Sequence, residues 1–293
     1  TVGLKIMRFG LTANVKRAGA REAIDDFVLW AEDTGNAVVL SDDLKELSGN
    51  GIEFCDRAHI ATQVDILVSM GGDGTLLSSA RAVRDSGTPL LGINLGSLGF
   101  LTQLTPQQLR PALDAICKGD YQVERRMVLR ADTEGIESLE SPFALNDVVV
   151  NNGPVTRLID INLCVNGENI VTYRADGLII STPTGSTGYS LAVGGPIMHP
   201  RMEAMIAAPI SSFALTTRPM ILSPDDVLEV KIVTPDHRGG LALDGQVMLS
   251  LEGDSKVTIT RADYHLKFIV FPENTFYKVL RNKLHWGHGP VGR

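Results

Sequence analysis

The 293-residue chain has few cysteines, no excess of positive charge and no long apolar run. Its three cysteines, Cys55, Cys117 and Cys164, are odd in number and far apart, so they indicate neither a disulfide framework nor a zinc cluster, and we expect a reducing, cytoplasmic setting. The formal net charge of −7 argues against nucleic acid or an anionic membrane surface as the main partner. No stretch has the length of a membrane span, and no secretory signal pattern is visible.

The remaining composition is that of an ordinary globular protein, with 44% hydrophobic and 21% charged residues. At roughly 150 residues per domain, the length predicts about two domains. The 29 glycines exceed the usual share and indicate many tight turns or close backbone approaches.

The first part of the chain alternates between strand and helix patterns. Such alternation predicts a Rossmann-like parallel sheet with helices on its faces, an α/β domain over residues 1–121. A Thr-Pro-Gln-Gln sequence from Thr105 has the capping residues of a helix start. The predicted strands are 4–11, 36–40, 64–70 and 89–94, and the predicted helices are 20–33, a segment after residue 74, and a segment from Thr105.

From about residue 122 the hydrophobic period changes to two. Apolar and polar residues alternate over 159–165, 228–232 and 256–260, and Asn166-Gly167 follows the first of these as a two-residue hairpin turn would. Many short strands at this spacing predict an all-β sandwich domain over residues 122–270. A further helix is predicted at 275–284.

The segment from Gly71 to Gly74 lies between a buried strand and a helix, where parallel sheets bind ligands. Its glycines allow the backbone amides and the helix dipole to approach a phosphate. Asp73 would repel that phosphate unless it accepts a proton from an attacking hydroxyl or helps to hold Mg²⁺. The alternative interpretation is a glycine-rich turn in which Asp73 caps the helix.

Three other segments carry candidate binding groups. Residues 176–190 are rich in hydroxyls and glycine, which suit ribose and phosphate oxygens, and Tyr189 could stack on a base; a capped turn is the alternative. Asn146 and Asp147 could hydrogen-bond a vicinal diol, or could be plain polar positions of a strand. Asp244-Gly245-Gln246 by itself predicts a hairpin turn.

Together the four segments resemble the NAD kinase family, which phosphorylates the 2′-hydroxyl of the adenosine ribose of NAD. The run from Thr182 to Thr187 is the most specific part of the resemblance. The resemblance implies ATP, or else inorganic polyphosphate, as phosphate donor, and Mg²⁺ or another divalent cation with it. It also implies a homo-oligomer, dimer or tetramer, and a C-terminal segment, 271–293, that packs back on the first domain.

The resemblance also assigns roles to individual residues. Asp73 is similar to the catalytic proton acceptor, and Asn146 and Asp147 match the pair that holds ribose. No protein metal ligand is implied. Two positions depart from the family pattern: Asp147 replaces the usual Glu, and Gly188 the usual Ala, which concerns fine specificity rather than the reaction. The other implied binding residues are Gly71, Gly72, Gly74, Arg157, Arg174, Asp176 at the nicotinamide end, Thr187, Gly188, Tyr189, Ser190, Leu191 and Ala192 at the adenine side, and Gln246.

Several alternatives remain at this stage. Diacylglycerol- or sphingosine-type kinases and phosphofructokinases also carry a glycine-aspartate loop, although the run from Thr182 to Thr187 favours a dinucleotide. The sequence around Ser190 loosely resembles the nucleophile elbow of a serine hydrolase but lacks its final glycine. A non-catalytic NAD-binding sensor would not retain Asp73. The sequence leaves open the choice between ATP and polyphosphate, the acceptance of NADH, feedback by NADP(H), and the oligomeric state.

Overall fold

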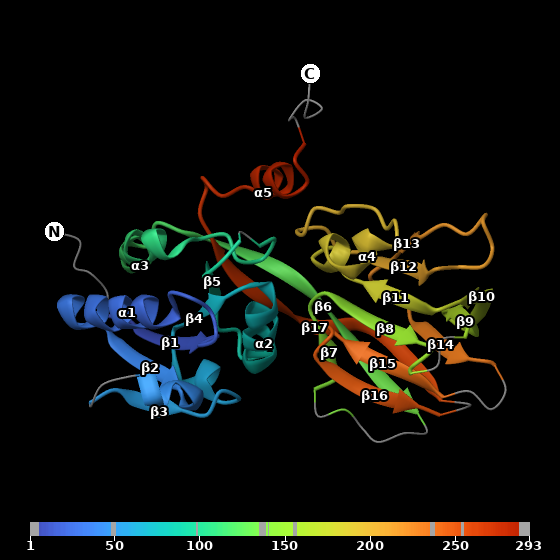
Figure 1. The fold of residues 1–293 in the computed structure, drawn as a ribbon, viewed down its shortest axis with the longest axis horizontal. Helices are drawn as coiled ribbons and strands as arrows, with labels where there is room; N and C mark the ends of the chain where they lie inside the picture. The colour runs from blue at the N-terminus through green and yellow to red at the C-terminus, as the bar shows by residue number, and fades with distance from the viewer. Residues whose placement is uncertain are drawn as a thin grey trace. The chain divides into compact units, whose positions relative to one another are not determined.

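The structure is a computed structural model that describes residues 6–47, 51–97, 99–134, 139, 141–154, 157–234, 238–252 and 255–286. Two compact units are present: unit 1 comprises Thr1–Arg125 and Leu266–Arg293, and unit 2 comprises Arg126–His265 (Figure 1). The first unit is α/β and the second is a β-sandwich, so the predicted fold class is confirmed. None of the helices in the described ranges has the length and apolar character that a membrane span requires.

Unit 1 is built on a parallel sheet with the strand order β3-β2-β1-β4-β5, to which the last residues of β17 add next to β5. The central strands are buried on both faces, which explains why their sequences are continuous apolar runs. The strands are β1 (Arg8–Ala13), β2 (Ala37–Ser41), β3 (Glu53–Cys55), β4 (Ile66–Gly71), β5 (Leu90–Asn94) and β17 (Lys256–Val270).

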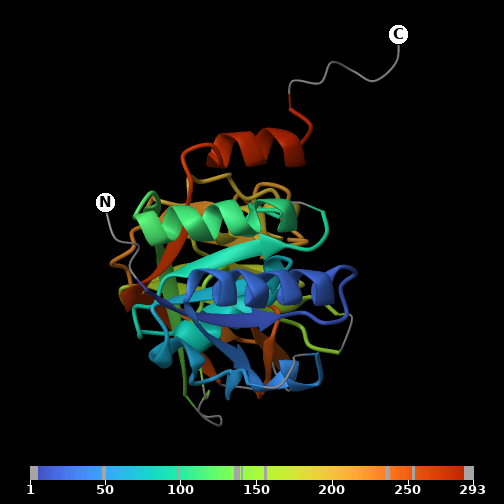
Figure 2. The same cartoon turned by 90° about the vertical axis from the view of Figure 1, so that its left-hand side faces the viewer.

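Helices cover both faces of this sheet. On one face α1 (Ala20–Thr34) and α3 (Leu109–Lys118) lie side by side (Figure 2) and bury Phe27 and Trp30 against Phe9 of β1. On the opposite face lies α2 (Asp73–Val83), whose Leu76 packs where Gly92 of β5 has no side chain. The remaining helical segments of unit 1 are η1 (Asp42–Leu47), η2 (Ile60–Gln63), η3 (Pro106–Gln108) and α5 (Phe276–Lys283).

The predicted elements of unit 1 are largely present, with shifts at their ends. The helix predicted from Thr105 begins as the 3₁₀ turn η3 before α3, and the Gln108 side chain accepts the Thr105 N–H at 3.0 Å as a capping box requires. The first predicted strand starts later, at Arg8, and residues 1–5 lie outside the described residues. Strand β3 was not predicted because its three residues are too short for a pattern.

Unit 2 consists of two packed sheets. One has the order β10-β9-β14-β17 with β6 and β7 attached, and the other has the order β13-β12-β11-β8-β15-β16. Alternate apolar residues from both sheets, such as Ile161 and Ile180, fill the space between them. The strands are β6 (Gln122–Glu134), β7 (Phe143–Ala144), β8 (Asp147–Asn151), β9 (Ile159–Val165), β10 (Glu168–Ala175), β11 (Gly177–Ser181), β12 (Met205–Ile210), β13 (Met220–Leu222), β14 (Leu228–Ile232), β15 (Gly239–Leu243) and β16 (Val247–Leu251).

The turn chemistry of unit 2 follows its sequence. Asn166 and Gly167 join β9 to β10 with φ angles of 52° and 81°, the positive values of a type I′ hairpin, so that prediction is confirmed. Strand β11 leads directly into η4 (Gly185–Thr187) and α4 (Tyr189–Ala192). The hydroxyl- and glycine-rich segment therefore begins at the end of a fully buried strand, which fixes its starting point.

Candidate nucleotide-binding and catalytic site

The glycine-aspartate loop occupies the place in unit 1 where ligands are expected. Strand β4 ends at Gly71 and α2 begins at Asp73. The strand order reverses between β1 and β4, and in open α/β sheets the ligand crevice lies at the carboxyl ends of such a pair. The turn itself needs glycine, because a Cβ on Gly71 would lie 2.6 Å from the Cβ of Thr75.

The carboxylate of Asp73 is held by a segment that follows β5. Its Oδ1 accepts the N–H of Leu101 at 3.1 Å and both the N–H and the hydroxyl of Thr102 at 3.0 Å. Its Oδ2 accepts the N–H of Phe100 at 2.8 Å. The helix-cap interpretation of Asp73 is therefore wrong, because Gly72 occupies the N-cap position and the carboxylate bonds to another segment. Each carboxylate oxygen has two lone pairs, and Oδ2 accepts one hydrogen bond whereas Oδ1 accepts three, so a further acceptor position remains on Oδ2.

Sequence reasoning missed the contribution of residues 99–102. A Cβ on Gly99 would lie 2.6 Å from both the Cγ of Asp73 and the hydroxyl of Thr102, so only glycine allows this close approach. The contacts join positions separated by 27 to 29 residues, and no local sequence pattern predicts them. The glycine itself was the one available signal.

In unit 2, Asp244 fixes the backbone that carries Asn146 and Asp147. Its carboxylate accepts the N–H groups of Leu145, Asn146 and Asp147 at 3.0, 2.7 and 3.1 Å. Asp244 and Gly245 have φ angles of 52° and 64°, and the Gln246 N–H donates to the carbonyl of Leu243 at 3.0 Å. The segment is thus the hairpin turn that the sequence predicts, and it also holds the start of β8.

Thr182 fixes the same backbone from its other side. Its hydroxyl donates to the carbonyl of Leu145 at 2.6 Å and accepts the N–H of Gly185 at 3.0 Å, while its own N–H donates to the carbonyl of Asn146 at 2.9 Å. A Cβ on Gly185 would lie 2.7 Å from the Cα of Asn146, so the two backbones touch. The Asn-Asp pair, the run after β11 and the β15–β16 turn therefore meet within unit 2.

The two side chains that this arrangement presents, a buried Asp147 and a half-buried Asn146, lack hydrogen-bond donors to their oxygens among the described residues. Asp147 is 6% exposed, and none of the described residues donates a hydrogen bond to its carboxylate. Burial first, and the nearby charge of Asp244 second, raise the pKa of Asp147 to about 7. In the described part of the chain the Oδ1 of Asn146 also has no hydrogen-bond partner. Unpaired buried polar groups of this kind are expected where a ligand supplies the partner.

Residues 187–192, which begin beside the Asn146-Asp147 pair, carry the exposed ring of Tyr189. A Cβ on Gly188 would lie 3.6 Å from the Nδ2 of Asn146 and 3.9 Å from the Oδ2 of Asp147, so the Gly188 backbone passes beside both side chains. The Tyr189 side chain that follows is 46% exposed and free to stack on a planar group. Thr187 and Leu191 are half-buried and Ala192 is exposed on the same short segment.

Ser190 does not have the environment of a nucleophile. Its side chain is fully buried, and its hydroxyl has no hydrogen-bond partner among the residues that the structure describes. A serine nucleophile needs a base within hydrogen-bonding reach and access to a substrate. The structure gives the serine hydrolase alternative no support.

The remaining predicted residues lie elsewhere on unit 2. Two of them, Arg157 and Asp176, share a partner. The Nδ2 of Asn152 donates to the carbonyl of Arg157 at 3.2 Å and to Asp176 Oδ1 at 3.3 Å, and the sequence analysis did not single out Asn152. Arg174 is exposed on β10, opposite Asp160 of β9. Gln246 is exposed in the β15–β16 turn. Within the described ranges, no group of three histidine, cysteine or acidic side chains is placed to hold a metal ion.

The chain combines an α/β unit, whose glycine-aspartate loop lies where the strand order reverses, with a β-sandwich that carries the Asn146-Asp147 pair. It is therefore a two-unit protein of the α/β plus β-sandwich class. Residues 10–121 match the family model of the ATP-NAD kinase N-terminal domain, and residues 145–271 match that of the C-terminal domain. The chain belongs to the NAD kinase family.

Individual relatives agree with the family models. The chain is 44% identical over 232 residues to an NAD kinase of Geotalea daltonii, covering 79% of this chain and 82% of that one. It is 37% identical over 282 residues to an NAD kinase of Desulforamulus reducens, covering 96% and 98%. Among solved structures, yeast NADH kinase complexed with NADH superposes with a TM-score of 0.89 at 22% identity, covering 98% and 90%, which supports the fold. An NAD kinase from Archaeoglobus fulgidus in complex with ATP superposes with a TM-score of 0.73 at 26% identity, covering 95% and 98%.

Proposed function

We propose that the protein is an NAD kinase that transfers the terminal phosphate of ATP to the 2′-hydroxyl of the adenosine ribose of NAD. Membership of the family at 37–44% identity over most of the chain supports this reaction. The observation that carries the proposal is the Asn146-Asp147 pair: neither the buried Asp147 carboxylate nor the Oδ1 of the half-buried Asn146 accepts a hydrogen bond from a described residue, and hydroxyl donors of a ligand suit both. A ribose diol supplies such donors.

The residues of unit 2 then bind the dinucleotide. Asn146 and Asp147 hold the ribose hydroxyls, and Tyr189 stacks against the adenine. Thr187, Gly188, Ser190, Leu191 and Ala192 line the adenine side. Arg157, Arg174, Asp176 and Gln246 provide further contacts, with Asp176 at the nicotinamide end. This division agrees with the rigid attachment of residues 145–147 by Asp244 and Thr182, because a binding group must be positioned before the ligand arrives.

In the reaction, the 2′-oxygen forms a bond to the γ-phosphorus while the bond from that phosphorus to the β,γ-bridging oxygen breaks, and ADP leaves. The hydroxyl proton passes to Asp73, at the acceptor position on Oδ2 that its four hydrogen bonds leave open. Most of the acceleration comes from positioning and charge neutralisation. Mg²⁺ enters with the nucleotide as part of the substrate.

The rival kinases share the glycine-aspartate loop but not the features of unit 2. A lipid or sugar phosphate acceptor has no adenine to stack on Tyr189. We further propose a cytoplasmic homo-oligomer, as the family resemblance implies.

A coupled assay tests the function. The purified protein is supplied with NAD, Mg²⁺ and ATP, and the NADP formed is read with an NADP-specific dehydrogenase. We expect NADP to accumulate only when all three are present. Phosphorylation of a diacylglycerol or of fructose 6-phosphate in place of NAD would overturn the proposal.

A further inference from the structure

A buried amide lies next to the segment that supports Asp73. Asn94 is the last residue of β5 and is 3% exposed. Strand β5 pairs with β4 so that Asn94 lies opposite Gly71, from which the glycine-aspartate loop starts. The side chain of Thr102, whose hydroxyl donates to Asp73, is fully buried as well. Buried polar groups are normally hydrogen-bonded, so the direction of each of their bonds is informative.

The surrounding backbone fixes the orientation of the Asn94 amide. Its Oδ1 accepts the N–H of Gly96 at 2.7 Å, and its Nδ2 donates to the carbonyl of Ser97 at 2.9 Å. A backbone N–H can only donate and a carbonyl can only accept, so turning the amide by half a rotation would lose both bonds. The Nδ2 therefore donates its second hydrogen to the Thr102 hydroxyl oxygen, which lies 2.7 Å away.

This orientation also fixes the direction of the Thr102 hydroxyl proton. A hydroxyl has one hydrogen to donate, and an amide NH₂ group cannot accept it. In the described part of the chain, the acceptor that remains for this hydrogen is Oδ1 of Asp73, at 3.0 Å. Asn94, Thr102 and Asp73 thus form a relay in which both hydrogen bonds run towards the carboxylate. Successive hydrogen bonds of the same direction polarise and strengthen one another.

The relay makes the two oxygens of Asp73 unlike each other. Oδ1 accepts three hydrogen bonds, whereas Oδ2 accepts one. A proton on Oδ1 would face the N–H groups of Leu101 and Thr102, and a hydroxyl that Asn94 prevents from turning round. Oδ2 is therefore the oxygen on which Asp73 can hold a proton, and the relay keeps it so.

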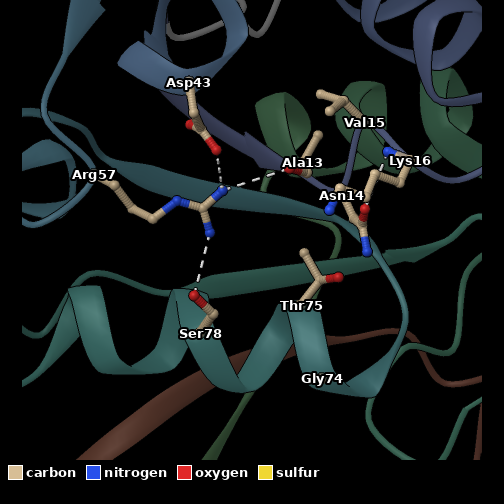
Figure 3. Close-up of a pocket in the computed structure, with 9 residues that line it drawn as sticks. All are labelled: Ala13, Asn14, Val15, Lys16, Asp43, Arg57, Gly74, Thr75 and Ser78. Atoms are coloured by element: carbon tan, nitrogen blue, oxygen red, sulfur yellow. Dashed lines mark hydrogen bonds and ion pairs between the residues drawn. The ribbon is translucent and has the colours of Figure 1, made fainter. Parts of the chain in front are cut away.

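The relay is separate from the cavity that borders α2. This cavity has a volume of about 450 Å³, and Arg57 in its lining donates to the Ser78 hydroxyl at 3.3 Å and to the Ala13 carbonyl at 3.4 Å (Figure 3). Arg57 thereby ties α2 to β1 on the cavity side. Neither Asn94 nor Thr102 is among the described residues that line the cavity. Their contacts with the site therefore run through the carboxylate at the start of α2.

We propose that Asn94 is a positioning residue for phosphate transfer, which acts through Thr102 to fix the Asp73 carboxylate so that the 2′-hydroxyl proton is accepted on Oδ2. The inference rests on the proposed function and adds a residue that lies two hydrogen bonds away from the proton acceptor. The proton that the ribose hydroxyl releases goes to Oδ2, and the protons of the relay stay in place. Asn94 exchanges no proton at any step.

The substitution Asn94→Asp tests the direction of the relay. It keeps the size of the side chain and the acceptor for the Gly96 N–H, but it replaces the donor to Thr102 by an acceptor. The hydroxyl can then turn away from Asp73, and two carboxylates that share one hydroxyl hold a proton up to a higher pH than one does. At saturating NAD and ATP, the single-turnover rate should fall about tenfold below wild type at about pH 5.5 and less than about threefold at about pH 8.5.

Asn36→Asp is the matched control in the same unit. The Oδ1 of Asn36 accepts the N–H of Met7 at 2.9 Å, and its Nδ2 donates to the Thr34 hydroxyl at 2.8 Å, so its amide makes the same kinds of bond. The Thr34 hydroxyl, however, donates to the backbone carbonyl of Trp30 at 2.7 Å and not to a carboxylate. We expect this variant to follow the wild-type rate at both pH values.

Substitutions of Thr102 separate the hydroxyl from the packing of the side chain. Thr102→Val removes the hydroxyl and keeps the shape, and should lower the single-turnover rate about fivefold. Thr102→Ser keeps the hydroxyl and both of its bonds, and should return the rate to within about twofold of wild type. A role in packing alone predicts the opposite order, because serine lacks the buried methyl group that valine retains.

A stability measurement does not depend on turnover. Without nucleotide, Asn94→Asp should lose unfolding free energy relative to wild type as the pH rises from about 5 to about 8, because a buried carboxylate facing Asp73 is disfavoured when ionised. Combining Asn94→Asp with Asp73→Asn removes the facing charge, and should reduce this loss by at least about half relative to Asp73→Asn alone. Urea unfolding of the four proteins measures both effects.

The two proposals fail in different ways. Wild-type protein that makes no NADP would refute the proposed function but leave the stability measurement valid. The inference itself would be overturned by a rate loss in Asn94→Asp that does not vary with pH, or by Thr102→Ser as slow as Thr102→Val. A pH-dependent loss of stability that persists undiminished in the Asp73→Asn background would also overturn it.

Discussion

The raised pKa of Asp147 predicts an unusual dependence of stability on pH. The carboxyl group ionises at about 3.8 when unfolded and at about 7 in the native protein, because burial and Asp244 disfavour its charge. Its contribution to stability is therefore complete below about pH 3.8 and is lost as the pH rises towards 7. A shift of roughly three pKa units corresponds to about 4 kcal/mol when the group is fully ionised.

The substitution Asp147→Asn removes this ionisation and keeps the shape of the side chain. Between about pH 5 and about pH 8 the wild-type protein should lose about 2.5 kcal/mol of unfolding free energy relative to the variant, from the same two pKa values. Urea unfolding of both proteins without nucleotide measures the difference. Asp263→Asn makes the same charge change at an exposed position of unit 2 and should run parallel to the wild type.

Parallel curves for the wild type and Asp147→Asn would refute the reasoning. They would mean that the native carboxylate ionises normally, and so that it has a donor or solvent contact that the buried geometry does not provide. Addition of NAD to the wild type should flatten its curve, because hydroxyl donors from the ribose stabilise the ionised carboxylate.

Two further substitutions test the framework of unit 2. Gly185→Ala would place a Cβ 2.7 Å from the Cα of Asn146 and should lower the free energy of unfolding by roughly 2–4 kcal/mol, measured by thermal or urea unfolding. The control is Gly188→Ala, whose Cβ would have its nearest atom at 3.2 Å and should change the free energy of unfolding by less than about 1 kcal/mol. Equal effects of the two would contradict the close backbone contact. Tyr189→Ala should weaken NAD binding by about 1–3 kcal/mol with the KM for ATP unchanged, and unaltered NAD affinity would exclude the stacking role.

The sequence predicted the elements whose patterns are local. The alternation over Ile159–Val165 and the following Asn166-Gly167 turn define β9 and its hairpin without any tertiary information. The glycines around Asp73 likewise predicted a loop between a buried strand and a helix, and it lies between β4 and α2. In these cases a short local pattern of residue types is enough to indicate the element or the turn.

The sequence did not reveal the groups that position the site. The sequence predicts Asp244 as a turn residue, yet its carboxylate accepts hydrogen bonds from the backbone of residues 145–147, which lie 97 to 99 positions away in the chain. Arg57 bonds Ala13 across 44 residues, and the donors to Asp73 come from a segment with no motif of its own. Such contacts depend on how distant segments pack, which a single sequence does not state.

A test of Asp73 as proton acceptor must separate proton transfer from structural support, because its carboxylate also holds residues 100–102. Asp73→Asn would turn an amide towards the N–H of Phe100, an unfavourable contact of about 1–3 kcal/mol. Thr102→Val removes one donor to Oδ1 and leaves the open position on Oδ2 intact, so it reports the structural effect alone.

The most direct measurement is the single-turnover rate of phosphate transfer to NAD in these two variants, with thermal stability and NAD affinity recorded for each. We predict that Asp73→Asn lowers the rate roughly 10²–10⁴-fold with NAD affinity retained, and that Thr102→Val lowers it less than about tenfold. A near-normal rate for Asp73→Asn, or an equal loss in Thr102→Val, would contradict proton transfer to Asp73.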